Sequence, residues 1–165
     1  NKIMFDKVKK WFRNNLNVSI SVTPERKRVY VDMDGVLCDY WKRFYELQNE
    51  YIKLPQTTYG FYTSLEPIPG AIESFRWLEE RYDVYILTRP SYQNPLCYTE
   101  KRVWVEKHFG LETTKKLIIC WDKELLRGDY LIDDHDYRFD GELIRFGTDE
   151  FRDWEKVKEY LKLKK

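Results

Sequence analysis

The chain has 165 residues, about the length of a single domain with one hydrophobic core. Charged residues make up 35% of it but nearly cancel, to a formal net charge of +1, which excludes the overall basic field typical of nucleic-acid-binding proteins. We therefore expect no nucleic-acid polymer as partner. No apolar run is long enough to cross a bilayer, so we expect no membrane as partner either.

The three cysteines, Cys38, Cys97 and Cys120, are widely spaced and include no CxxC pair. This pattern fits neither a disulfide framework nor a zinc site, and it favours a reducing compartment. We therefore expect a cytoplasmic protein. Nothing in the sequence decides its oligomeric state.

The first 22 residues carry apolar side chains at helical spacing, which predicts a helical extension ahead of a core of residues 23–165. Such a helix can dock on the core, lie on a membrane surface or act as a transit peptide. We expect docking, because the arginine and serine richness of transit peptides is missing.

Beyond Pro24 the chain alternates short apolar runs with longer segments of helical spacing. The short runs predict strands buried on both faces, at residues 29–31, 84–87, 117–120, 130–132 and 143–146. The helical patterns cover residues 71–82, 100–109 and 150–163. This alternation predicts an α/β fold, a Rossmann-like parallel sheet of about five strands flanked by helices.

Residues 40–66 interrupt this alternation and predict a small helical cap inserted after the first strand. The segment begins with one amphipathic helical pattern and continues in a turn-rich, aromatic stretch, PQTTYGFYTSLEP. An insertion at this point lies beside the carboxyl ends of the strands, where open α/β sheets bind their ligands.

Four acids follow two of the predicted strands. Asp32 and Asp34 come directly after the first strand, and Asp133 and Asp134 come after the strand at 130–132. If both strands are central and parallel, their acids converge at one edge of the sheet. Buried carboxylates need compensating positive charge, and clustered hard oxygen ligands suit Mg²⁺.

A third strand ends in groups suited to an anion. Thr88 and Arg89 follow it with a hydroxyl and a cation, and Lys101 opens the next helical pattern. An anionic carboxylate can attack an anionic phosphate only where cations offset the repulsion. Together with the acids, these residues predict phosphoryl transfer.

These motifs match a known pattern. DMDGV, the strand ending in Thr88, the lysine of YTEKRVWVEKHFG and LIDD resemble, in order, the four motifs of the haloacid dehalogenase-like (HAD) phosphatases. More narrowly, DMDGVLCDY, LEPIPGA, EKRVWVEKHFG and the DK before DYLIDD resemble the 5'(3')-deoxyribonucleotidases. The resemblance covers most of residues 29–135.

The resemblance implies a HAD-like core and a magnesium-dependent hydrolase of nucleoside monophosphates. Asp32 is then the nucleophile that forms an aspartyl-phosphate, and Asp34 protonates the leaving oxygen and later activates water. Asp32, the backbone carbonyl of Asp34 and Asp133 hold Mg²⁺, with Asp134 in or near its shell.

The same resemblance implies which residues bind the substrate. Thr88 and Lys101 grip the phosphate, and Tyr40 stands where the family places an aromatic ring against the base. The chain departs from the family in a shorter cap and at three positions. The family's serine after Thr88 is Arg89, its arginine before DK is Trp121, and its basic residue after the Asp-Asp pair is His135.

Other interpretations stay open at this stage. DMDG alone is compatible with a plain turn, and Lys123 with either a solvated or a functional lysine. The alternative functions are a phosphatase of another small phosphomonoester and a phosphate-binding regulatory module without turnover.

Overall fold

The structure is a computed structural model that describes residues 4, 6–7 and 25–164. The helical extension predicted for residues 1–22 lies almost entirely outside these described residues. Within them, no helix is both long and apolar enough to span a membrane.

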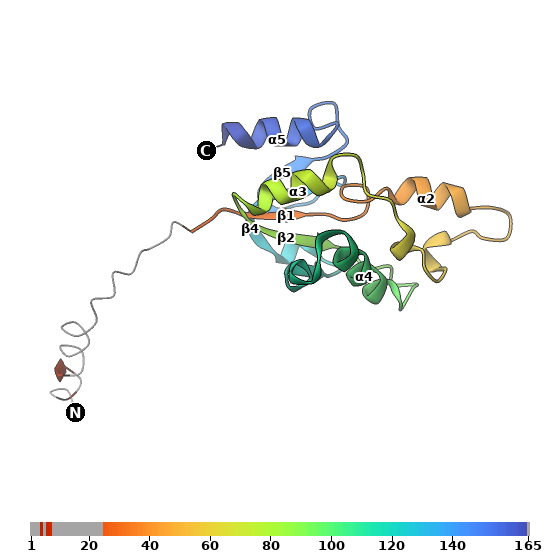
Figure 1. The fold of residues 1–165 in the computed structure, drawn as a ribbon, viewed down its shortest axis with the longest axis horizontal. Helices are drawn as coiled ribbons and strands as arrows, with labels where there is room; N and C mark the ends of the chain where they lie inside the picture. The colour runs from red at the N-terminus through yellow and green to blue at the C-terminus, as the bar shows by residue number, and fades with distance from the viewer. Residues whose placement is uncertain (1–3, 5, 8–24, 165) are drawn as a thin grey trace.

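In the described part of the chain, five parallel strands form one sheet in the order β3-β2-β1-β4-β5. The strands are β1 (Arg28–Val31), β2 (Asp83–Thr88), β3 (Leu117–Ile119), β4 (Arg127–Asp133) and β5 (Asp140–Arg145). This arrangement confirms the predicted α/β fold. It also places β1 between β2 and β4, so the carboxyl ends of these three strands meet at one edge of the sheet (Figure 1).

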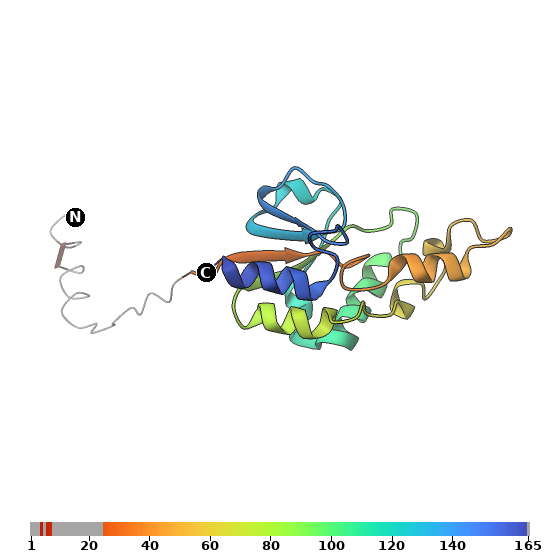
Figure 2. The ribbon, with the colours of Figure 1, turned by 90° about the horizontal axis from the view of Figure 1, so that it is seen from above.

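Three helices cover one face of the sheet, namely α3 (Ala71–Glu79), α4 (Cys97–Phe109) and α5 (Trp154–Leu163) (Figure 2). Val29 and Val31 of β1 point into this main core, whereas Tyr30 between them points to the other face. That alternation is the ordinary two-residue period of a strand. The other face is covered by a smaller apolar cluster that includes Leu126 and Phe139.

Residues 40–66 extend beyond the carboxyl ends of the strands (Figure 1). They contain α2 (Tyr40–Leu47) and two short 3-10 helices, η1 (Pro55–Thr57) and η2 (Tyr62–Ser64). Phe61, Tyr62 and Leu65 are buried in the main core, so the inner half of this cap is packed against the sheet domain. The other 3-10 helices are η3 (Leu111–Lys116) and η4 (Lys123–Leu125).

Several element ends differ from the predicted ones. α5 begins at Trp154 rather than at residue 150, because the Asp153 side chain accepts a hydrogen bond from the Lys156 backbone N–H and caps the helix there. α4 begins three residues earlier than predicted, at Cys97. α4 has no side-chain cap, and its first residue instead donates a backbone hydrogen bond to the Asn94 carbonyl of the preceding turn.

Candidate active site

The ends of β1 and β4 bring Asp32 and Asp133 together around one lysine. The Asp32 backbone N–H donates to the Ile132 carbonyl at 2.9 Å, which continues the pairing of the two strands by one residue. Lys123 Nζ then lies 2.7 Å from Asp32 Oδ1 and 2.6 Å from Asp133 Oδ2. Lys123 is only 1% exposed, so this charge cluster is almost wholly withdrawn from water.

Burial changes the acidity of this cluster. The pKa of the Asp133 carboxyl is raised to about 7, first by burial and then by the negative charge of Asp32, against the opposing charge of Lys123. The pKa of Lys123 is raised because the attraction of the two carboxylates outweighs its desolvation. Lys123 therefore keeps a fixed positive charge beside Asp32 at neutral pH.

A second buried lysine joins β2 to the loop that follows β1. Lys101, which is fully buried, donates to Asp34 Oδ2 at 2.7 Å, to Thr88 Oγ1 at 2.7 Å and to the Arg89 carbonyl at 2.6 Å. The pKa of Asp34 is raised by burial, although the charge of Lys101 opposes the rise. A carboxyl group with a raised pKa is suited to donate a proton.

The loop between Asp32 and Asp39 depends on Gly35. The Met33 carbonyl accepts hydrogen bonds from the backbone N–H groups of three residues, Val36, Leu37 and Cys38, which forms a compact turn. Gly35 has a φ of 80°, and a Cβ added there would clash with the Asp134 carboxylate. The glycine thus allows the loops after β1 and β4 to approach each other closely.

The carboxylates fit a hard divalent cation. Asp133, Asp134 and His135 each offer a ligand atom, and these atoms lie within 4.8 Å of one another. Among the described residues, Asp32 Oδ2 and Asp134 Oδ2 have no hydrogen-bond partner, while Asp133 Oδ1 accepts only from the His135 backbone N–H. Carboxylate oxygens of this kind are the ligands that Mg²⁺ prefers.

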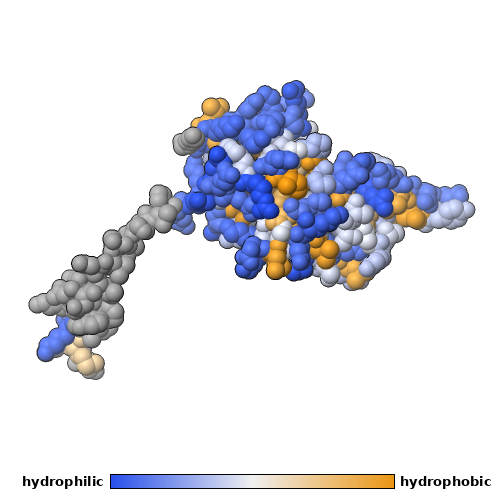
Figure 3. All heavy atoms as spheres, in the orientation of Figure 1, coloured by the Kyte–Doolittle hydropathy of each residue, from blue (hydrophilic) through white to orange (hydrophobic). Residues whose placement is uncertain are grey.

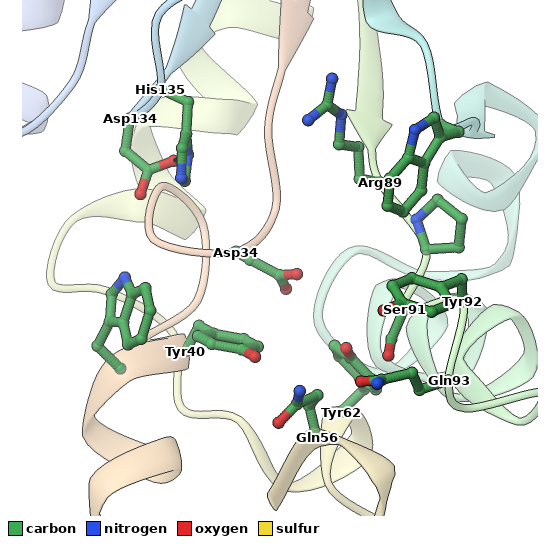
Figure 4. Close-up of a pocket in the computed structure, with 13 residues that line it drawn as sticks. Asp34, Tyr40, Gln56, Tyr62, Arg89, Ser91, Tyr92, Gln93, Asp134 and His135 are labelled. Carbon is green, nitrogen blue, oxygen red and sulfur yellow. Dashed lines mark hydrogen bonds and ion pairs between the residues drawn. The ribbon is translucent and has the colours of Figure 1, made fainter. Parts of the chain in front are cut away.

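Next to these groups lies a pocket of about 310 Å³. Figure 4 shows Asp34 pointing into it, with Tyr40 and Arg89 on different sides. The remaining lining residues come from the cap, from the loop after β2 and from the loops after β3 and β4, and they are Trp41, Gln56, Tyr62, Pro90, Ser91, Tyr92, Gln93, Trp121, Asp134 and His135. A pocket with polar groups at one end and aromatic walls is typical of a small-molecule site.

The structure brings the predicted site residues to this one region. Asp32 and Asp133 meet at Lys123, Asp34 and Thr88 meet at Lys101, and the remaining three line the pocket, namely Tyr40, Arg89 and Asp134. The roles assigned to these residues stay predictions.

Two residues of the site were not identified from the sequence. The sequence does not decide the role of Lys123. Its position in the short connection that follows β3, a strand whose carboxyl end lies beside that of β2, is the signal that could have found it. Glu100 was missed altogether. Its carboxylate accepts hydrogen bonds from the backbone N–H groups of Gly60 (2.8 Å) and Tyr62 (3.0 Å), and so anchors the cap to α4.

Most of the chain is similar to known proteins. Residues 51–156 match the family model described as "5' nucleotidase, deoxy (Pyrimidine), cytosolic type C protein". A Vibrio phage KVP40 protein assigned as a 5'(3')-deoxyribonucleotidase is 40% identical over 141 residues, which cover 81% of this chain and 83% of the relative. The human cytosolic-type 5'(3')-deoxyribonucleotidase is 33% identical over 163 residues, covering 79% of this chain and 78% of the relative.

Proposed function

Because the chain belongs to the 5'(3')-deoxyribonucleotidase family, which lies within the HAD-like phosphatases, we propose that it hydrolyses deoxyribonucleoside monophosphates with the help of Mg²⁺. Its general activity is that of a nucleotide phosphomonoesterase. The proposal adds the deoxyribose preference, the metal and the roles of the residues, together with a cytoplasmic location.

The observation that carries the proposal is the pair of buried lysines. Lys123 lies against Asp32 and Asp133, and Lys101 lies against Asp34 and Thr88. Fixed positive charges in a site withdrawn from water stabilise negative charge far better than solvated ones do. This arrangement is what the attack of a carboxylate on a phosphate dianion needs.

In the first step, a carboxylate oxygen of Asp32 forms a bond to phosphorus as the bond from phosphorus to the ester oxygen breaks. Asp34 gives its proton to the departing ester oxygen, which leaves as the nucleoside hydroxyl. Thr88 and Lys101 hold the phosphate oxygens during the transfer. The aspartyl-phosphate is the covalent intermediate.

In the second step, Asp34, now ionised, takes a proton from a water molecule as that water attacks phosphorus. The bond from phosphorus to Asp32 breaks, and inorganic phosphate is released with the Asp32 carboxylate restored. Lys123 keeps its positive charge beside Asp32 throughout, which limits the charge that builds up at the nucleophile.

Asp32, the Asp34 carbonyl, Asp133 and Asp134 would hold Mg²⁺. When bound, the ion supplies positive charge that polarises the phosphate and offsets its repulsion of the attacking carboxylate. This ligand set is supported by the free carboxylate oxygens of Asp32 and Asp134 and by the short separation of the ligand atoms of Asp133 and Asp134.

The substrate occupies the pocket, with Tyr40 beside the base and Arg89 as a further cation for the phosphate end. Among the described residues, no carboxylate lies within ion-pair distance of Arg89, whose guanidinium rests over the Tyr137 ring at 4.7 Å from the centroid. A cation without a protein counter-ion is available to an anionic ligand.

A substrate panel tests the proposal. Phosphate release is measured for deoxyribo- and ribonucleoside monophosphates and for sugar phosphates, with and without Mg²⁺, in the wild type, in Asp32→Asn and in Asp149→Asn. Asp149 is an exposed acid that does not line the pocket, so its variant is the matched control. Release that needs Mg²⁺, favours deoxynucleotides and disappears only in Asp32→Asn supports the proposal. Preferred cleavage of sugar phosphates, or no turnover at all, would overturn it.

A further inference from the structure

Large aromatic side chains gather at the mouth of the pocket, where folding alone does not require them. The surface drawn in Figure 3 is mostly hydrophilic, with small apolar patches among charged residues. At the pocket, Trp121 is 56% exposed and Tyr92 is 77% exposed, although burying an aromatic ring is favourable. Exposed aromatic rings that line a cavity offer a flat apolar contact to a ligand bound there.

Trp121 and Tyr92 pack edge to face on the side of the pocket that belongs to the sheet domain. Their ring centroids are 5.7 Å apart and the ring planes are nearly perpendicular, at 80°. The Arg89 guanidinium lies 5.6 Å from the centroid of the Trp121 ring and 4.7 Å from that of Tyr137. These contacts favour one orientation of the indole while leaving about half of its surface open.

The backbone that carries Trp121 is tied to the phosphate end of the site on both sides. Just before it, the Cys120 backbone N–H donates to the Thr88 carbonyl at 3.0 Å. Just after it, Asp122 caps η4 by accepting from the Glu124 N–H, and Lys123 reaches Asp32. Trp121 therefore sits on a short loop whose position relative to Thr88 and Asp32 is fixed.

The opposite side of the pocket is aromatic as well. Tyr40 and Trp41 lie at the start of α2 in the cap and line the same pocket. Figure 4 shows Tyr40 and Tyr92 on opposite sides, with Asp34 pointing into the space from above. A flat group bonded through a sugar to the reacting phosphate fits between these walls.

We propose that Trp121, supported by Tyr92, stacks on the base of the bound nucleotide. The inference rests on the proposed function and names a residue that selects the substrate class, planar heteroaromatic bases over unsubstituted sugar phosphates. A deoxyribose phosphate without a base has no group to stack. The selectivity thus arises partly from the sheet domain, on the side facing the short cap.

The test compares substrates with and without a base. In Trp121→Ala, kcat/KM for a deoxyribonucleoside 5'-monophosphate falls about tenfold, mainly through a higher KM, because base stacking is lost. kcat/KM for deoxyribose 5-phosphate stays at the wild-type value. Trp121→Phe retains most of the nucleotide activity. Leu125→Ala, which removes an exposed apolar side chain outside the pocket, changes neither substrate.

Equal losses on both substrates, or an unchanged nucleotide KM in Trp121→Ala, would overturn the stacking inference while leaving the proposed function in place. A wild type that does not hydrolyse nucleotides would instead overturn the proposed function and the inference with it.

A binding measurement provides a second readout. In Asp32→Asn, the deoxynucleotide quenches tryptophan fluorescence, and adding Trp121→Phe reduces that quenching. Undiminished quenching in the double variant contradicts the inference.

Discussion

Lys123 Nζ lies 2.7 Å from Asp32 Oδ1, inside the sheet edge at which β1 and β4 end. The contact places a permanent positive charge against the proposed nucleophile. A positive charge is therefore in place beside Asp32 before any substrate arrives.

Replacing the lysine removes the charge that faces the nucleophile. Lys123→Met lowers kcat by about 10²- to 10³-fold, the usual loss when a preorganised charge is removed from a reacting centre. Steady-state phosphate release measures the effect. Lys162→Met, which neutralises an exposed lysine of α5, is the control and keeps wild-type kcat. Normal turnover in Lys123→Met would remove this residue from the mechanism.

The raised pKa of Asp133 makes metal binding depend on pH. The carboxyl group of the metal-free protein has a pKa of about 7, because burial and the charge of Asp32 disfavour its ionised form. A proton on Asp133 competes with the cation, so Mg²⁺ affinity falls by about tenfold for each pH unit below that value and levels off above it. Calorimetric titration with Mg²⁺ between about pH 5.5 and 8.5 measures this. An affinity that does not change with pH disagrees with this account.

The role of Gly35 can be tested against a second glycine of the same chain. Both Gly35 and Gly147 have positive φ angles, 80° and 83°, but an added Cβ meets the Asp134 carboxylate only at Gly35. Gly35→Ala therefore weakens Mg²⁺ binding and abolishes turnover, because the Asp134 carboxylate is displaced. Gly147→Ala costs about 1–2 kcal/mol of unfolding free energy and leaves kcat unchanged. Similar kinetics in the two variants would show that the loop has room to adapt.

Glu100 fixes the cap. The residue is 5% exposed, and its carboxylate accepts hydrogen bonds from two backbone N–H groups of the cap. One of these donors is Tyr62, whose ring centroid lies 5.0 Å from Lys101 Nζ. Glu100→Gln replaces one acceptor oxygen by a donor, so we expect a loss of about 1–3 kcal/mol in unfolding free energy and a higher KM for nucleotides. Thermal unfolding and steady-state kinetics test this against Glu106→Gln, a partly exposed glutamate of the same helix whose carboxylate pairs with Arg102 rather than with the cap. Wild-type stability and KM in Glu100→Gln would refute the anchoring role.

The sequence predicted the part of the site that lies at strand ends. Asp32 and Asp133 each follow an apolar run directly. Neighbouring parallel strands bring such residues to the same edge of the sheet, whatever the conformation of the loops. The α/β fold followed from the same alternation of runs. The helix starts at Cys97 and Trp154 could not be placed as well. A turn in which the Cys97 N–H donates to the Asn94 carbonyl precedes α4, and the Asp153 side chain caps α5.

The contacts that were not predicted are long-range and depend on loop conformation. Glu100 on a helix beside a lysine is indistinguishable from a solvated residue, since its partners are backbone amides 38 and 40 residues away. Lys123 reaches Asp32 only because η4 turns back toward the sheet edge. A one-dimensional pattern carries no information about such a return of the chain.

Phosphorylation of Asp32 during turnover is tested most directly by acid-quenching the enzyme during deoxynucleotide hydrolysis and mapping its peptides by mass spectrometry. We expect one added phosphoryl group on the peptide that contains Asp32, present in Asp149→Asn and absent in Asp32→Asn. A phosphoryl group on another residue, or phosphate release by Asp32→Asn at the wild-type rate, would contradict it.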